Sequence, residues 1–189
     1  MKVRESGMPE EEIWSKFFDV DLIFSELEIN SSIQDMAEVG CGYGTFTIPA
    51  VKYIKGNLYS FDIEDEMIAI VKQKLKSEAL TNVILFERDV LSHSTGLPEN
   101  SMDYVMLFNI MHHHSPENFL NEAYRILKPM GKIGIIHWRS DIDTPRGPDL
   151  SIRPNPEEIT EKLDLAKFKI KRPAFWLPPY HYGIILSKK

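Results

Sequence analysis

Three glycines alternate with larger residues in the stretch Glu38-Val39-Gly40-Cys41-Gly42-Tyr43-Gly44, which the hydrophobic pattern places between a strand and a helix. Glycines at such a junction let the backbone turn sharply and let a ligand approach it without meeting a Cβ atom. The predicted helix that follows, starting near Thr45, adds free backbone N–H groups at its first turn. The stretch therefore predicts a binding site built largely from backbone atoms.

Two common phosphate-binding loops do not fit this glycine pattern. A dinucleotide fingerprint would need glycines at positions 40, 42 and 45, and position 45 is Thr. A P-loop would need a Lys followed by Ser or Thr, and no such pair follows the glycines. The ligand is therefore not expected to present a pyrophosphate, and an NAD-dependent oxidoreductase is disfavoured.

An acidic residue ends the next predicted strand. Asp62 lies 18 positions after Gly44, which is near the spacing that one strand–helix–strand unit requires. A carboxylate can accept two hydrogen bonds at once from neighbouring hydroxyls. Asp62 is therefore a candidate hydrogen-bond acceptor at the end of this strand.

Four segments in order, Glu38-x-Gly-x-Gly-x-Gly, 59–63, 87–90 and 103–131, resemble the motifs of class I S-adenosylmethionine-dependent methyltransferases. Within that family they are most similar to the small-molecule branch around ubiquinone and menaquinone methyltransferases. The resemblance implies that Asp62 binds the ribose hydroxyls, that Asp89 accepts from the adenine amino group, and that Asn109 faces the transferred methyl. The cofactor-binding residues that it implies are Glu38, Gly40, Cys41, Gly42, Tyr43, Gly44, Asp62, Ile63, Asp89, Val90 and Asn109.

Two residues of the glycine loop have alternative roles. Cys41 is expected to be a small packed residue and not a nucleophile. Glu38 either caps the loop backbone as a buried acid or contacts the methionine amino group of the cofactor, and both roles are compatible.

The elements that must position these residues alternate along the chain, as judged from apolar runs and helical periodicity. Strands are expected over 34–39, 57–62, 83–86, 104–108 and 132–138, and helices over 45–54, 65–80, 116–127 (capped by Ser115) and 157–166, with loops over 89–100 and 139–156. Such alternation predicts a parallel sheet with helices on both faces. Two last strands, 168–172 and 183–186, leave no room for a helix and predict an antiparallel hairpin. The expected fold is α/β, a Rossmann-like seven-stranded sheet that is mostly parallel.

The N-terminal 30 residues are expected to form a helical lid of two short amphipathic helices, placed on a methyltransferase domain of residues 31–189. No linker or repeat separates the two parts, so one structural domain is expected overall. The length of 189 residues suits a single core.

Acceptor-binding residues are expected where the carboxyl ends of the parallel strands meet the hairpin tip. His137 is the first candidate for a general base and His181 the second, since imidazole suits proton transfer near neutral pH. The candidate acceptor contacts are Trp14, His113, Trp138, Arg139, Arg146 and Tyr180. No metal is expected, because the adjacent side chains of 112–114 point in different directions.

Charge and composition limit the classes of binding partner that are expected. The chain has 22 Lys and Arg against 28 Asp and Glu, and residues 1–38 alone carry a net charge of −7. This charge is opposite to the basic surface of a nucleic-acid binder. A single Cys and the lack of a long apolar stretch suggest a cytoplasmic protein without a membrane span, either a monomer or a homodimer. The main hypothesis is methyl transfer to a small molecule, and the alternatives are a cofactor-binding protein without transfer or a protein-directed methyltransferase.

Overall fold

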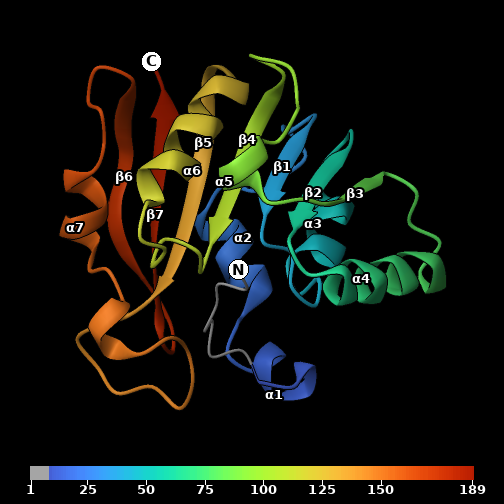
Figure 1. The fold of residues 1–189 in the computed structure, drawn as a ribbon, viewed down its shortest axis with the longest axis horizontal. Coiled ribbons are helices and arrows are strands. Elements are labelled where there is room, and N and C mark those ends of the chain that lie inside the picture. Colours follow the sequence, from blue (N-terminus) through green and yellow to red (C-terminus); the bar gives the residue numbers. More distant parts are fainter. Residues whose placement is uncertain (1–8) are drawn as a thin grey trace.

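The computed structural model describes residues 9–189 and contains a seven-stranded sheet with the order β3-β2-β1-β4-β5-β7-β6 (Figure 1). The strands are β1 (Met36–Val39), β2 (Leu58–Asp62), β3 (Val83–Glu87), β4 (Met102–Phe108), β5 (Leu127–Trp138), β6 (Phe168–Leu177) and β7 (His181–Lys188). The first five pair in parallel, and β7 pairs antiparallel with both β5 and β6. The predicted fold, including the C-terminal hairpin, is confirmed.

The helices are α1 (Glu11–Ser15), α2 (Val20–Glu26), α3 (Thr47–Tyr53), α4 (Asp65–Ser77), α5 (Val90–His93), α6 (Pro116–Ile126) and α7 (Pro156–Glu161), with a 3₁₀ turn at Leu150–Ile152. Several local predictions were wrong. β5 begins at Leu127 and not at 132, and β6 continues to Leu177 and not only to 172. The loop predicted over 89–100 begins with α5, because the Asp89 carboxylate caps that short helix. Ser115 makes no side-chain cap on α6, and α7 ends at Glu161, well before the predicted residue 166.

Both faces of the sheet are covered, because alternate residues of each central strand enter different hydrophobic clusters. Met106 packs with α1, α2 and α3 on one face, whereas Val105 and Leu107 pack with α6 and α7 on the other. Figure 1 shows α5 and α6 on one side of the sheet and α2 on the opposite side. A sheet buried on both faces explains why its strands read as continuous apolar runs.

The register brings the carboxyl ends of the parallel strands to one edge of the sheet. Val39 of β1 lies beside Phe61 of β2 and beside Leu107 of β4. The segments that follow β1, β2 and β4 therefore lie next to one another, and in Figure 1 the arrowheads of these strands point to the same edge. Trp138 at the end of β5 pairs with His181 at the start of β7, so the hairpin tip reaches this edge as predicted.

The N-terminal helices pack onto the core beside this edge. The predicted lid covers residues 1–30, of which the first eight lie outside the described residues. Phe24 and Leu27 of the α2 region are fully buried. The Trp14 ring lies 6.0 Å from the Trp138 ring, and the Phe18 ring lies 5.0 Å from that of Phe46. These contacts tie the segment to β5 and α3.

Candidate functional site

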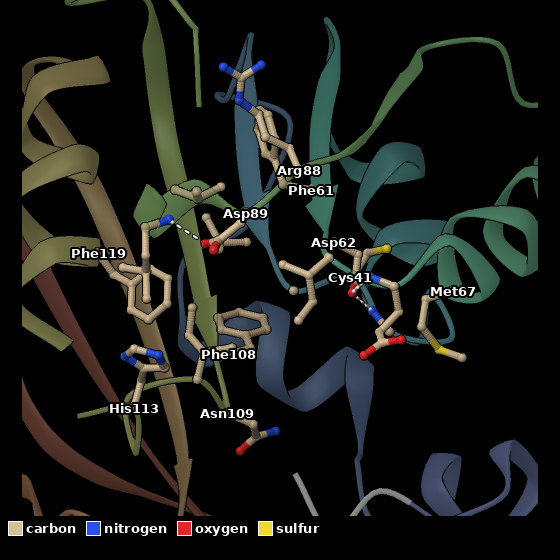
Figure 2. A pocket seen from close by; sticks show the side chains of 18 of the residues that line it. Cys41, Phe61, Asp62, Met67, Arg88, Asp89, Phe108, Asn109, His113 and Phe119 are labelled. Carbon is tan, nitrogen blue, oxygen red and sulfur yellow. Dashed lines mark hydrogen bonds between the residues drawn. The ribbon is translucent and has the colours of Figure 1, made fainter. Parts of the chain in front are cut away.

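A cavity of about 790 Å³ opens at the carboxyl ends of β1, β2, β3 and β4, and we call it the main cavity. Figure 2 shows Asp62 and Met67 on one side of it, His113 and Phe119 on the other, and Asn109 at the bottom of the view. Of the predicted cofactor-binding residues, those that line it are Gly40, Cys41, Gly42, Asp62, Ile63, Asp89, Val90 and Asn109. The sequence motifs therefore converge on one space although they lie on four separate segments.

The glycine loop is held close to β2 by its own backbone. The N–H groups of Gly40 and Cys41 both donate to the carbonyl of Phe61, at 2.8 and 3.2 Å. Gly40 has a φ of +83°, and a Cβ at this position would lie 3.1 Å from Cγ2 of Ile110. Only glycine takes this conformation without strain. The loop thus presents bare backbone to the main cavity, as predicted.

The Asp62 carboxylate is fixed by two backbone donors. Its Oδ2 accepts from the N–H of Gly42 at 2.8 Å, and its Oδ1 accepts from the N–H of Glu64 at 3.1 Å. Each carboxylate oxygen has two lone pairs. The side chain lines the main cavity, so each oxygen keeps capacity for a hydroxyl donor there.

Glu38 lies behind the loop and does not line either of the two cavities described here. Its Oε2 accepts hydrogen bonds of 2.6 Å from both Thr47 Oγ1 and Ser60 Oγ. Burial raises the pKa of Glu38 to about 7, against the lowering effect of these two hydroxyl donors. This placement supports the role of a buried acid beneath the loop, and a contact with the methionine amino group stays a prediction.

Cys41 lines the main cavity but is only 5% exposed. Burial raises the pKa of its thiol, and the nearby carboxylates of Glu38 and Asp62 raise it further. A thiolate is therefore disfavoured, in agreement with a packed residue and not a nucleophile.

The Asp89 carboxylate has structural partners of its own at the start of α5. Its Oδ1 accepts from the N–H groups of Leu91 and Ser92, and its Oδ2 accepts from Ser92 Oγ at 2.7 Å. Asp89 also lines the main cavity, where Figure 2 places it across from Asp62 and Asn109. The cap fixes the carboxylate in place, and a contact with an adenine amino group stays a prediction.

Asn109 stands out because both polar atoms of its side chain are buried and make no hydrogen bond within the described part of the chain. Its backbone lies in the left-handed region, with a φ of +57°, a conformation that Asn tolerates better than most residues. Unpaired buried amides are rare because they lose their hydrogen bonds to water. Asn109 lines the main cavity, and neither the donor nor the acceptor of its amide is used within the described part of the chain.

The two histidines predicted as bases lie away from both cavities. His137 is fully buried, and His181 is packed between the rings of Phe18 and Trp138, at 4.5 and 4.2 Å. Burial lowers the pKa of each to about 3. Neither residue is among those that line the main cavity, so direct contact with an acceptor has no support from this geometry.

The predicted acceptor contacts fall into two groups. Trp14 and His113 line the main cavity. Trp138 is fully buried with Tyr180 stacked on it, Arg139 pairs with Asp141, and Arg146 is exposed on the loop after β5. The structure does not bring this second group to the wall of the main cavity. Of the four segments expected at the acceptor cleft, namely 109–114, 137–139, the loop after β5 and the hairpin tip, only 109–114 lines this cavity, together with Trp14 of the lid.

Sequence reasoning did not single out several cavity residues, namely Thr45, Phe46, Met67, Phe108, His112, Ser115, Asn118 and Phe119. The apolar ones were read only as core, since periodicity cannot tell a cavity wall from a packed interior. His112 was considered individually only as a metal ligand, although its segment, 109–114, was expected at the acceptor cleft. Within residues 9–189, no group of three or more His, Cys, Asp or Glu side chains could hold a metal ion, and none of the helices there is long and apolar enough to cross a membrane.

These features fit S-adenosylmethionine. A bare glycine loop, a fixed carboxylate at the end of β2 and an unpaired amide at the end of β4 match the parts of a nucleoside joined to an amino acid. A methyltransferase domain family model matches residues 36–131, about half of the chain. The chain belongs to the class I S-adenosylmethionine-dependent methyltransferases.

Three comparisons show the range of the similarity. A "Probable S-adenosylmethionine-dependent methyltransferase" of Mycolicibacterium smegmatis is 25% identical over 171 residues, covering 87% of this chain and 63% of its own length. A demethylmenaquinone methyltransferase of Geobacillus is 30% identical over 99 residues, covering 51% and 42%. The crystal structure of a SAM-dependent methyltransferase from Aquifex aeolicus is 23% identical, with a TM-score of 0.81 and 92% of both chains covered. The chain thus spans less than two thirds of these two curated relatives, and the likeness to the crystal structure shows the fold.

Proposed function

We propose that the protein transfers the methyl group of S-adenosylmethionine to a small organic acceptor by in-line displacement. The observation that carries this proposal is the unpaired amide of Asn109, a residue that lines the same cavity as Gly40, Gly42 and Asp62. When bound, the cofactor supplies a sulfonium-activated methyl carbon. The remaining work is positioning, since holding two reactants in line and excluding water accounts for much of such a rate.

Each of the cavity residues would have a role that follows from its position. Asp62 would bind the ribose hydroxyls, Asp89 would hold the adenine end, and Gly40 and Gly42 would leave room for the methionine portion. Asn109 lines the same cavity as these residues and His113, so its amide is suited to align the methyl-bearing end with the acceptor. Trp14, Phe108 and Phe119 supply apolar walls that exclude water.

The limited volume of the main cavity favours a small acceptor. The main cavity of about 790 Å³ is closed on one side by Trp14 of α1, which is 7% exposed and packed against Trp138. A curated relative is named for a small molecule, demethylmenaquinone. Both points favour a metabolite over a protein acceptor, and the acidic N-terminal segment disfavours a nucleic acid.

Binding and transfer can be tested in sequence. Isothermal titration with S-adenosylmethionine, S-adenosylhomocysteine and NAD should give binding of the first two only. Label transfer from methyl-labelled S-adenosylmethionine should then be measured against a panel of phenols, amines, thiols and carboxylates, with a disordered peptide library alongside. Binding of NAD alone would contradict the cofactor assignment. Binding of S-adenosylmethionine without transfer to any acceptor would favour a binding protein of the same fold, and transfer to peptides alone would favour a protein-directed enzyme.

A further inference from the structure

His112 and His137 form a hydrogen-bonded pair that joins the main cavity to the buried end of β5. Nδ1 of His112 lies 3.2 Å from Nε2 of His137, and Nδ1 of His137 lies 3.1 Å from the carbonyl oxygen of Trp138. His112 is partly buried and lines both the main cavity and a neighbouring cavity of about 450 Å³. His137 is fully buried and lines neither.

The order of these contacts fixes where the protons lie. A backbone carbonyl can only accept, so Nδ1 of His137 carries a hydrogen and donates to Trp138. In a neutral ring the other nitrogen, Nε2, is then an acceptor. It must receive its hydrogen bond from His112, so Nδ1 of His112 carries a hydrogen as well. The remaining nitrogen, Nε2 of His112, is left with a free lone pair.

Burial keeps both rings in this neutral form. It lowers the pKa of His112 to about 4 and that of His137 to about 3, and the neighbouring His113 lowers the former further. Within residues 9–189, Nε2 of His112 has no hydrogen-bond partner, and it points away from His137 because the two ring nitrogens face different directions. The bare nitrogen is therefore available to a ligand of the cavities that His112 lines.

We propose that His112, with its tautomer set by His137 and the Trp138 carbonyl, accepts the proton of a hydroxyl acceptor during methyl transfer. This inference rests on the proposed function and narrows its acceptor to a hydroxyl compound such as a phenol. His112 is then the catalytic residue, and His137 is a positioning residue that acts through it. The base that the sequence predicted at His137 is therefore replaced by its hydrogen-bond partner His112, which lines the cavities.

The step balances in protons and electrons. The acceptor oxygen uses a lone pair to form the new bond to the methyl carbon, while the sulfur–carbon bond breaks and its electron pair returns to sulfur. The O–H proton passes to Nε2 of His112, and the resulting imidazolium later releases it to solvent. During this time Nδ1 of His112 still donates to His137, and that hydrogen bond strengthens when its donor is charged.

The tautomer can be read directly by NMR without any turnover. The protein, labelled with ¹⁵N in its histidines, would be recorded in long-range ¹H–¹⁵N spectra at pH 7.5, with His112→Asn to assign the His112 signals. The expected result is a neutral His112 with its hydrogen on Nδ1. A hydrogen on Nε2, or a charged ring, would overturn the proposal. His93→Asn, which changes an exposed histidine outside both cavities, is the matched control and should leave these signals in place.

The role toward a hydroxyl is tested by titrating phenol and its methyl ether, anisole, into the labelled protein saturated with S-adenosylhomocysteine. Phenol is expected to shift the Nε2 signal of His112 toward that of a hydrogen-bonded nitrogen, whereas anisole, which cannot donate, is not. An equal shift with both probes, or none with either, would overturn the proposal. Failure of S-adenosylhomocysteine to bind would instead contradict the proposed function, so the two failures are distinguishable.

The positioning role of His137 is tested by a pair of variants. His137→Gln keeps a strong side-chain acceptor for His112, whereas His137→Met offers only a weak thioether acceptor. The Nδ1–H form of His112 is expected to persist in the first variant and to mix with the other tautomer in the second. Equal spectra for both would argue that His137 only fills space. If His137→Met does not fold, the wild-type tautomer and the phenol titration still decide the proposal.

Discussion

The backbone N–H of Gly42 donates a 2.8 Å hydrogen bond to Oδ2 of Asp62. This bond joins the glycine loop after β1 to the acid that ends β2. A change in the Asp62 carboxylate would therefore alter the position of the loop as well as the binding of a ligand. The two sequence motifs therefore belong to one site. The glycine loop lines the main cavity, and it also holds Asp62 at the edge of that cavity through this hydrogen bond.

Asp62→Asn should weaken binding of S-adenosylmethionine by about 10- to 100-fold. The amide can still accept from Gly42 through its oxygen, but its NH₂ group then faces the N–H of Glu64 and can no longer accept a ribose hydroxyl. Hydrogen bonds to charged groups are worth about 1.5–3 kcal/mol, which corresponds to this range. Isothermal titration measures it. Asp65→Asn, an exposed acid at the start of α4, is the control, and equal affinities for both variants would contradict the assignment.

Gly40→Ala should lower both stability and cofactor affinity. A non-glycine residue at a φ of +83° costs about 1–2 kcal/mol of unfolding free energy. The added Cβ also lies 3.1 Å from Ile110 and displaces the loop. Gly96→Ala is a matched control, because its φ is +74° but the nearest atom to its Cβ is 3.5 Å away on Arg88. Denaturant unfolding and titration of both variants separate the backbone strain, which they share, from the crowding of Gly40. A Gly40 variant with wild-type affinity would show that the loop does not bind the cofactor.

Glu38 should make the protein less stable as the pH rises from 5 to 8. Its pKa is raised to about 7 in the folded state, compared with 4.5 for the free side chain, so the folded protein binds this proton more tightly. The stabilisation is fully present below pH 4.5 and is lost as the pH rises through 7, a change of about 2 kcal/mol from pH 5 to pH 8.

Glu38→Gln imitates the protonated form and should remove this part of the pH dependence. The unfolding free energy of the variant and of the wild type should therefore differ more at pH 8 than at pH 5, with the variant favoured at pH 8. Urea unfolding at the two values measures it. Parallel pH profiles for both proteins would show that Glu38 is ionised throughout this range.

His181 should have the opposite effect on stability, which it should lower as the pH falls. Burial lowers its pKa from 6.5 to about 3, so the unfolded state binds the proton more tightly and stability falls as the pH drops below 6.5. His181→Phe removes a ring nitrogen that is buried without a partner in the described chain and keeps an aromatic ring between Phe18 and Trp138. Compared with the wild type, the variant should gain about 2 kcal/mol more at pH 5 than at pH 8.

The same variant tests the placement of His181 away from the cavities. His181→Phe should keep methyl transfer, because the residue lines neither cavity. Loss of transfer with unchanged cofactor affinity would restore His181 as a candidate base. Thermal unfolding at both pH values, run beside the label-transfer assay, gives both answers from one protein preparation.

The sequence predicted those parts of the fold and site that depend on local order along the chain. Asp62 could be placed because an acid at the end of a buried strand must lie at the edge where the parallel strands end. The glycine loop could be placed because its residue types are needed only at a strand-to-helix turn. His137 was expected at the end of its strand on this edge, and the structure places it there, between the Trp138 carbonyl and His112.

The remaining parts depend on side-chain directions that no spacing encodes. His112 and His137 lie 25 positions apart, and their contact requires the turn after β4 to fold back toward β5. Trp138 and Tyr180 were expected in the cleft because Trp138 ends a strand and Tyr180 lies in the hairpin turn, both at the correct edge. They instead pack on α1 and the turn that follows it, where Trp14 and Phe17 complete an aromatic cluster. These packing contacts determine that the side chains of Trp138 and Tyr180 fill the core and do not face a cavity.

Asn109 offers a way to separate binding from folding. Its amide has no partner in the described chain, so removing it should cost the folded protein little, while the φ of +57° should penalise any residue that has a Cβ and lacks a polar side chain. Asn109→Gly should therefore unfold within about 1 kcal/mol of the wild type, and Asn109→Ala should be less stable than the glycine variant by about 1 kcal/mol. Both variants lack the amide, so both should bind S-adenosylmethionine more weakly or transfer the methyl group more slowly, and by similar factors. Urea unfolding and isothermal titration of the pair measure these effects. Loss of function in the alanine variant alone would mean that the backbone at this position matters and the amide does not.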